Sequence, residues 1–200
     1  MQTILQLNAS ILSDNGQSSR LANEFVAAAR KDGKLIVRDL ASDPVPHLDA
    51  ERFSAFTTAK EKRTAQQEQV VAYSDKLIGE LKEADVIVLG LPMYNFGVPS
   101  MLKAYFDHVA RAGATFNYTA TGPVGLLTGK KVYVFAARGG MYAGTPRDTQ
   151  TAYVRDFFAF LGITDIEFVY AEGLAISETS RNAALSKARA EIQRLVPAYA

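Results

Sequence analysis

Two nearly continuous apolar runs, "DVIVLGL" at residues 85–91 and "KKVYVFAA" at residues 130–137, constrain the fold most strongly. Runs rich in β-branched and other apolar residues are typical of parallel strands that are covered on both faces of a sheet. Both runs are far shorter than the ~20 apolar residues of a membrane-spanning helix. We therefore expect them to form the centre of a buried parallel sheet.

Strand and helix patterns alternate around this centre. The strand-like segments are residues 3–8, 34–40, 85–91, 130–137 and 164–171. Apolar residues at helical spacing predict one helix that begins at Ser18/Ser19 and further helices over residues 64–83, 99–112, 148–161 and 179–196. Residues 41–53 predict an irregular excursion, and residues 114–127 a short hairpin-like one. Strict alternation favours a three-layer, flavodoxin-like α/β fold: a five-stranded parallel sheet of order 2-1-3-4-5 with helices on both faces.

The composition limits the number of domains and the kinds of partner. A chain of 200 residues, of which 48% are apolar, favours one domain over residues 1–200. The 22 Lys and Arg residues nearly balance the 21 Asp and Glu residues, so no strong field would attract nucleic acid or an anionic membrane. The chain has no cysteine, and its start, "MQTILQLNAS", lacks the basic region of a signal peptide. We expect a soluble, cytoplasmic protein without a metal site, whose partner is a small neutral molecule and whose redox chemistry would need a cofactor.

Three unusual loops follow strands of the predicted sheet. In the order 2-1-3-4-5, ligands bind beyond the carboxyl ends of the strands, where the first and third strands diverge. The loops after Asn8, Leu91 and Ala137 should therefore converge. The first loop, "NASILSDNGQSSR", offers serine hydroxyls and the N–H groups of a helix start, which suit a phosphate group. An ordinary serine cap is the alternative interpretation.

The second and third loops suit a flat heterocycle. "PMYNFGVPS" offers the amide of Asn95 together with flat apolar side chains, and "AARGGMYAGTP" places two adjacent glycines directly after a strand. Glycines allow the main chain to approach a ligand closely, so that its N–H groups can face a polar ring edge. An isoalloxazine has such an edge beside an apolar ring. The alternatives are aromatic side chains that plug the next helix and a plain tight turn.

Several long motifs resemble one family over essentially the whole chain. "SILSDNGQS", "PMYNFGVPSMLKAYFDHVARAG", "TFNYT", "GLLTGKK", "ARGG" and "FLGITDIEFVYAEG" closely resemble the FMN-dependent NADH-azoreductase/NADH:quinone reductase family. The resemblance implies a flavodoxin-like homodimer that holds FMN non-covalently at its interface. It also implies two-electron, ping-pong transfer from NADH or NADPH to quinones and aromatic azo compounds.

The resemblance also assigns site residues. It implies that the FMN phosphate and ribityl chain meet Ser10, Gly16, Gln17 and Ser18, that the ring lies against Met93, Tyr94, Asn95 and Phe96, and that the pyrimidine edge meets Ala137, Arg138, Gly139 and Gly140. At Gly16 and Ala137 the chain departs from the family pattern, where serine is frequent. By family position, Tyr118 and Phe160 would cover flat aromatic substrates, from the partner subunit.

No side chain is expected to be a catalytic acid or base, because the flavin carries the chemistry and solvent can supply protons. His47 and His108 are lone histidines, to which we assign structural or solvent-facing roles. Two other functions stay open. A flavodoxin-type electron carrier would share the fold and FMN but serve protein partners, usually through an acidic surface. A flavin-free receiver module would need an acidic cluster, whereas the first strand here ends in Asn8-Ala9-Ser10.

Overall fold

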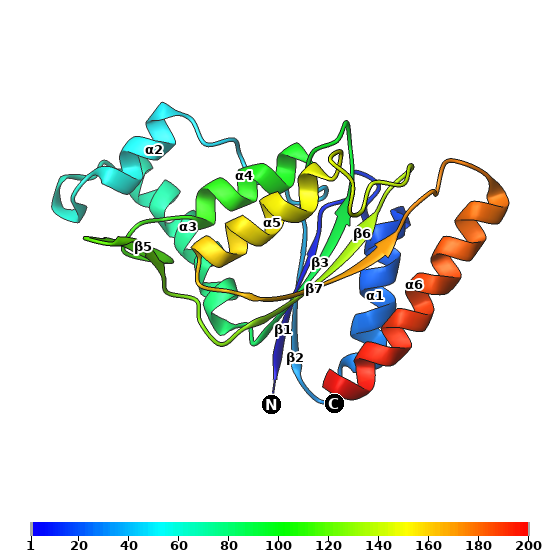
Figure 1. Cartoon of the computed structure of the whole chain (residues 1–200). Helices are drawn as coiled ribbons and strands as arrows, with labels where there is room; N and C mark the ends of the chain where they lie inside the picture. The colour runs from blue at the N-terminus through cyan, green and yellow to red at the C-terminus, as the bar shows by residue number, and fades with distance from the viewer. Residues whose placement is uncertain (1, 200) are drawn as a thin grey trace.

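A computed structural model describes the backbone of residues 2–199 and the side chains of residues 2–196 (Figure 1). The strands are β1 (Thr3–Asn8), β2 (Lys34–Asp39), β3 (Val86–Pro92), β4 (Phe116–Thr119), β5 (Gly122–Gly125), β6 (Lys131–Ala137) and β7 (Asp165–Ala171). The helices are α1 (Gln17–Ala29), α2 (Ala50–Thr57), α3 (Ala65–Glu83), α4 (Ser100–Val109), α5 (Thr149–Phe160) and α6 (Glu178–Tyr199), with 3-10 turns η1 (Ser13–Asn15) and η2 (Lys60–Lys62).

The main sheet has five strands in the order β2-β1-β3-β6-β7, and each neighbouring pair is parallel. When the strands of the β4–β5 hairpin are left out of the numbering, this is the predicted order 2-1-3-4-5. The flavodoxin-like α/β fold with a parallel five-stranded sheet is confirmed.

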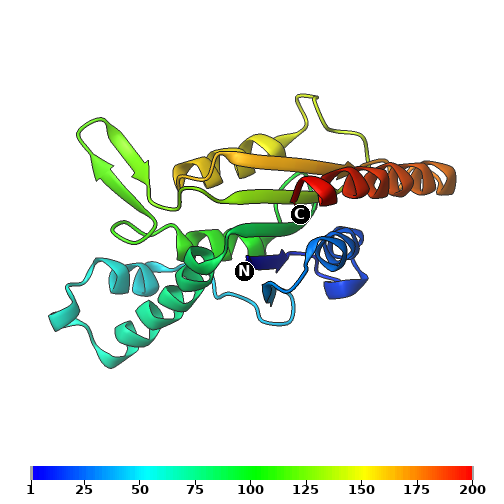
Figure 2. The same ribbon diagram turned by 90° about the horizontal axis from the view of Figure 1, so that it is seen from below.

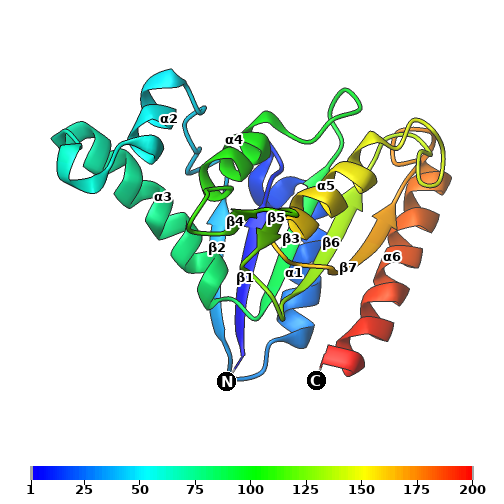
Figure 3. The same ribbon diagram turned by 60° about the vertical axis from the view of Figure 1, so that its left-hand side comes forward.

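Helices cover both faces of this sheet (Figures 1 and 3). Ile87 and Leu89 of β3 pack in the core with α3, α4 and α5, whereas Val86 and Val88 pack on the other face with α1 and α6. Every residue of β3 is buried, as expected from its unbroken apolar run. Full burial of a valine, isoleucine or leucine side chain contributes about 1.5–3 kcal/mol to the free energy of folding. The apolar central strands therefore stabilise the sheet.

The two excursions from the alternating pattern project from one side of the molecule (Figure 2). The predicted hairpin is confirmed as the antiparallel pair β4–β5. Residues 41–53, predicted to be irregular, lead into helix α2, which begins after Asp49, whose Oδ1 accepts a hydrogen bond of 2.8 Å from Arg52 N. The sequence pattern did not predict this helix, because the helix is short and follows two prolines.

Among the residues that the structure describes, none of the helices combines the length and the apolar character that crossing a membrane requires.

Candidate functional site

The loops after β1, β3 and β6 meet at the carboxyl rim of the sheet, as predicted (Figure 1). The Tyr94 hydroxyl lies 3.4 Å from Ser10 Oγ and accepts a hydrogen bond of 3.3 Å from Ile11 N, so it joins the first two loops. Met93 N donates to Ala137 O at 3.1 Å, which joins the second loop to the third. The three loops therefore form one continuous surface.

The first loop leads into the start of helix α1. Gly16 is the N-cap of this helix and provides no capping side chain. Ser18 and Ser19 lie in the first turn, and both hydroxyls are buried without a hydrogen-bond partner in the described part of the chain. A helix start with free N–H groups and unpaired hydroxyls attracts anions, because the helix dipole leaves partial positive charge there.

The missing side chain at Gly16 is required by the packing of Ser10. A Cβ atom at position 16 would lie 2.1 Å from Ser10 Oγ and 2.5 Å from Ser10 Cβ. Ser10 is buried, and its Oγ accepts a hydrogen bond of 3.2 Å from Leu12 N. The glycine at this position thus allows the Ser10 hydroxyl to pack directly against the N-terminus of α1.

The second loop turns through an unusual backbone conformation. Asn95 and Phe96 have φ angles of 49° and 63°, in the left-handed region that non-glycine residues seldom adopt. Tyr94 and Gly97 close the turn with paired backbone hydrogen bonds of 3.3 and 3.0 Å. The turn leaves the Asn95 and Phe96 side chains exposed. Backbone strain of this kind persists where the surroundings fix the conformation, which is common at functional sites.

The first turn of helix α5 fixes this conformation. Gln150 is buried, and its Nε2 donates to Pro92 O at 2.9 Å and to Gly97 O at 2.8 Å. Thr149 Oγ1 donates to Phe96 O. Sequence reasoning missed both residues, and no local signal marks them, because their partners lie more than 50 positions away along the chain.

The third loop is joined to the chain that follows β7. Leu174 N donates to Arg138 O at 3.1 Å, Ala175 N to Gly139 O at 3.0 Å, and Gly173 N to Gly140 O at 2.9 Å. The N–H groups of Gly139 and Gly140 have no acceptor among residues 2–199, so they remain available to a ligand.

The Arg138 side chain is not exposed at the rim. It is fully buried, and it forms ion pairs with Asp148 at 2.9 Å and Glu172 at 3.1 Å. Burial pushes the pKa of Asp148 upward, but hydrogen bonds from Arg138 and Thr151 outweigh burial, so the pKa lies below its usual range. Of the residues assigned to the pyrimidine edge, Arg138 can thus contribute only its backbone.

Tyr118 and Phe160 lie together but away from the three loops. Both rings pack on Phe116, with centroids 5.2 and 4.3 Å from it. Tyr118 is 76% exposed. It belongs to the β4–β5 hairpin, which lies at the far end of α5 from the rim (Figure 1). The structure therefore brings these two aromatic side chains near each other, but not near the remaining site residues of the same chain.

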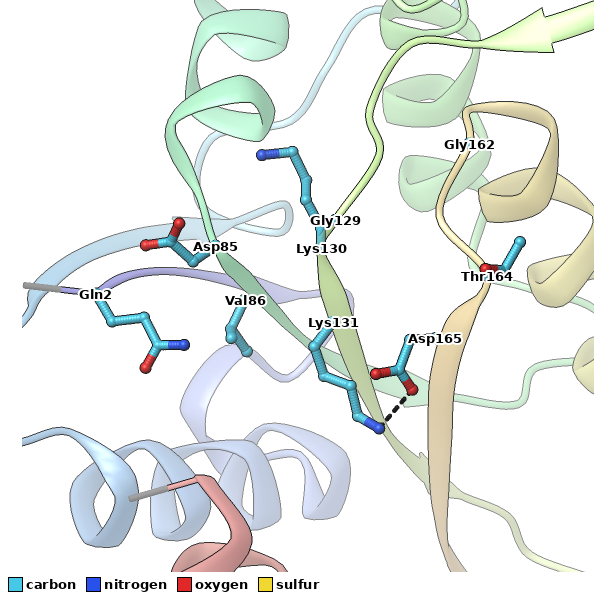
Figure 4. A pocket seen from close by; sticks show the side chains of 9 residues that line it. All are labelled: Gln2, Asp85, Val86, Gly129, Lys130, Lys131, Gly162, Thr164 and Asp165. Atoms are coloured by element: carbon cyan, nitrogen blue, oxygen red, sulfur yellow. Dashed lines mark hydrogen bonds and ion pairs between the residues drawn. The ribbon is translucent and has the colours of Figure 1, made fainter.

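Two cavities lie at opposite ends of the sheet. At the carboxyl rim, a cavity of about 450 Å³ is lined by Phe96, Pro146, Arg147 and Thr149. A cavity of about 690 Å³ lies at the amino ends of the strands (Figure 4). Its cations serve other contacts: Lys130 Nζ donates to backbone carbonyls at the end of α3, and Lys131 pairs with Asp165 at 2.6 Å. The convergent loops, and not this second cavity, are the candidate site.

His108, for which we expected a structural or solvent-facing role, is buried away from the rim. Its Nε2 lies 3.0 Å from Pro46 O, and the rings of Phe56 and Tyr73 pack edge-on against it. Burial lowers the pKa of His108 below its usual range, against the opposing effect of the Pro46 hydrogen bond.

Comparison with known proteins identifies the family to which this fold and sequence belong. A family model described as a flavodoxin-like fold matches residues 2–196. The chain is 55% identical to the FMN-dependent NADH:quinone oxidoreductase of Cellvibrio japonicus (strain Ueda107), over 99% of this chain and 100% of the relative.

Solved structures agree with this placement. The azoreductase from Bacillus anthracis str. Sterne has 28% sequence identity and a TM-score of 0.89, over 98% of this chain and 99% of that one. The FMN-dependent NADH-azoreductase from Bacillus anthracis str. Ames Ancestor, solved in complex with FMN, has 28% identity and a TM-score of 0.87, over 98% and 100%. These findings confirm the resemblance identified from the motifs, and the chain belongs to the flavodoxin-like FMN-dependent NADH-azoreductase/NADH:quinone reductase family.

Proposed function

We propose that this protein is an FMN-dependent oxidoreductase, with the whole chain forming one FMN-binding domain. Two electrons pass from NADH or NADPH to quinones and aromatic azo compounds in a ping-pong reaction. The observation that carries the proposal is the meeting of three loops with distinct chemistry at one rim, in a chain 55% identical to an FMN-dependent NADH:quinone oxidoreductase.

The first loop fits the phosphate end of FMN. Among the described residues, the hydroxyls of Ser18 and Ser19 are buried without partners, and the N-terminus of α1 has no side-chain cap. A phosphate would accept hydrogen bonds from these groups and from the nearby helix N–H groups. Together with Ser10, Gly16 and Gln17, they form a cradle that needs no lysine.

The second and third loops fit the ring. Met93, Tyr94 and Phe96 offer apolar surface, and Asn95 offers an amide. When bound, FMN supplies the two-electron chemistry, which the protein orients and tunes. The N–H groups of Gly139 and Gly140 are held in place by the ladder to residues 173–175. Donors fixed before reaction stabilise the negative charge that develops at the pyrimidine edge.

No side chain of the rim needs to act as an acid or base. His108 is enclosed by aromatic rings and bonded to Pro46 O, so it serves packing. Protons for a quinone or azo acceptor would come from solvent.

A homodimer would complete the site. The projecting hairpin exposes apolar side chains, with Tyr118 76%, Val124 49% and Leu126 42% exposed. Tyr118 and Phe160 are remote from the loops of their own chain, so they suit a role as a cover over the rim of a second copy. Aromatic side chains stack on flat substrates at the usual several-ångström spacing.

The visible spectrum of the purified protein, followed by NADH and NADPH oxidation with a quinone and with an azo dye, tests the proposal. We expect flavin absorbance, oxidation with both acceptors and parallel lines in double-reciprocal plots. A yellow protein that does not oxidise either nucleotide would indicate a flavodoxin-type carrier. A protein that takes up no FMN would indicate a flavin-free module.

A further inference from the structure

A buried charge cluster lies directly behind the third loop. It consists of Arg138, Asp148 and Glu172, whose side chains are 0%, 8% and 9% exposed. One guanidinium and two carboxylates leave this cluster, the Arg138 triad, with a net charge of −1. The Arg138 guanidinium also lies over the Tyr170 ring, 5.0 Å from its centroid.

The triad holds the loop that carries Gly139 and Gly140. Glu172 Oε1 accepts hydrogen bonds from Tyr142 N and Ala143 N, both at 2.9 Å, in addition to the one from Arg138. A single carboxylate oxygen therefore joins both ends of residues 138–143. Hydrogen bonds to a charged acceptor are stronger than those between neutral groups.

The triad also reaches the second loop through helix α5. Asp148 caps this helix by accepting from Thr151 N at 3.1 Å, while it pairs with Arg138. The next two residues, Thr149 and Gln150, hold the left-handed turn at 95–96. One charge cluster thus sets the position of both loops proposed to face the ring.

We infer that the Arg138 triad is a positioning device that aligns these loops and, through its net negative charge, lowers the reduction potential of the bound flavin. The inference rests on the proposed placement of the FMN ring. Reduction adds negative charge at the pyrimidine edge, and a buried negative charge nearby opposes that change, because screening is weak inside a protein. The enzyme would then hold a more strongly reducing flavin.

Two variants test the inference through the potential of bound FMN, measured with excess FMN against reference dyes. Glu172→Gln and Asp148→Asn keep an oxygen acceptor of the same size but remove one negative charge. At a fixed ambient potential, we expect each to raise the ratio of reduced to oxidised bound FMN by about tenfold, which corresponds to about 30 mV for a two-electron couple.

A control lies in the ion-pair cluster near the other edge of the sheet, in which Glu80 is 15% exposed and Asp43 is 65% exposed. Arg38, 6% exposed, pairs with Glu80 at 2.6 Å and with Asp43 at 2.8 Å. Glu80→Gln therefore removes the less exposed carboxylate from a three-residue ion-pair cluster far from the third loop, and it should lower stability without moving the flavin potential.

An unchanged potential in both triad variants, or an equal shift in Glu80→Gln, would overturn the inference and leave the triad a purely structural brace. A wild-type protein that takes up no FMN is a different failure, because it would refute the proposed function itself.

Discussion

Gly16 is the position at which one added carbon should matter most. In Gly16→Ala, the new Cβ would force Ser10 to turn away and lose its hydrogen bond from Leu12 N. We expect a loss of about 1–3 kcal/mol in the free energy of unfolding, together with weaker FMN binding. Gly79→Ala is the control, since no atom of the described residues lies within 4 Å of the added Cβ in helix α3. It should raise stability by about 1 kcal/mol. Urea unfolding and FMN titration of both variants check the pair.

Asn95 combines a strained backbone with a side chain proposed to bind the ring, and two substitutions separate these roles. At its φ of 49°, alanine costs about 1–2 kcal/mol, whereas glycine adopts this conformation freely. We expect Asn95→Ala and Asn95→Gly to weaken FMN binding alike, but only the alanine variant to unfold at lower urea. Fluorescence titration with FMN measures the affinity. Wild-type affinity in Asn95→Gly would show that the amide does not contact the ring.

Helix α2 and the segment before it are joined to α4 through a buried imidazole. Because burial lowers the pKa of His108, the unfolded chain binds a proton more readily than the folded one. The contribution of the neutral ring is complete above the unfolded pKa of about 6.5. It is lost as pH falls through that value towards the lower folded pKa.

Urea unfolding between pH 7.5 and 5.5 should therefore show stability falling by at most about 1.4 kcal/mol per pH unit from this group. His108→Gln should flatten that slope. His47→Gln is the control, because His47 is exposed, and it should keep the wild-type slope. A slope that survives in His108→Gln would exclude His108 as its source.

Local patterns predicted the regular elements because the periodicity of a strand or helix depends on residues that are close together in the sequence. The apolar run at 85–91 and the helical spacing of apolar residues at 64–83 are of this kind. Helix α2 was missed because one short helix gives a weak periodic signal.

The side-chain contacts of Arg138 and Gln150 that support the site could not be predicted from the sequence, for a different reason. The partners of Arg138 lie at positions 148 and 172, and those of Gln150 at 92 and 97. Nothing in "ARGG" shows that its arginine turns inward. A motif therefore locates a loop, whereas the side-chain contacts that shape it depend on the completed tertiary structure.

The assembled molecule can be tested by mixing two defective variants. If Tyr118 serves the rim of a second copy, Tyr118→Ala and Asn95→Ala damage opposite contributors to each site. Mixing equal amounts under conditions of subunit exchange should restore about a quarter of the intact sites, since half of the dimers are mixed and each has one intact site. Azo-dye reduction measures the recovery, and native mass spectrometry confirms the exchange. Exchange without recovery would show that each chain builds its site alone.

The hydrogen bonds from Thr149 and Gln150 that hold the turn at 95–96 affect the entropy cost of ligand binding. These hydrogen bonds are made within the chain itself, so ligand binding need not order the turn and loses little conformational entropy there. The second loop is therefore preorganised for binding, and its fixed shape would set which ligands fit.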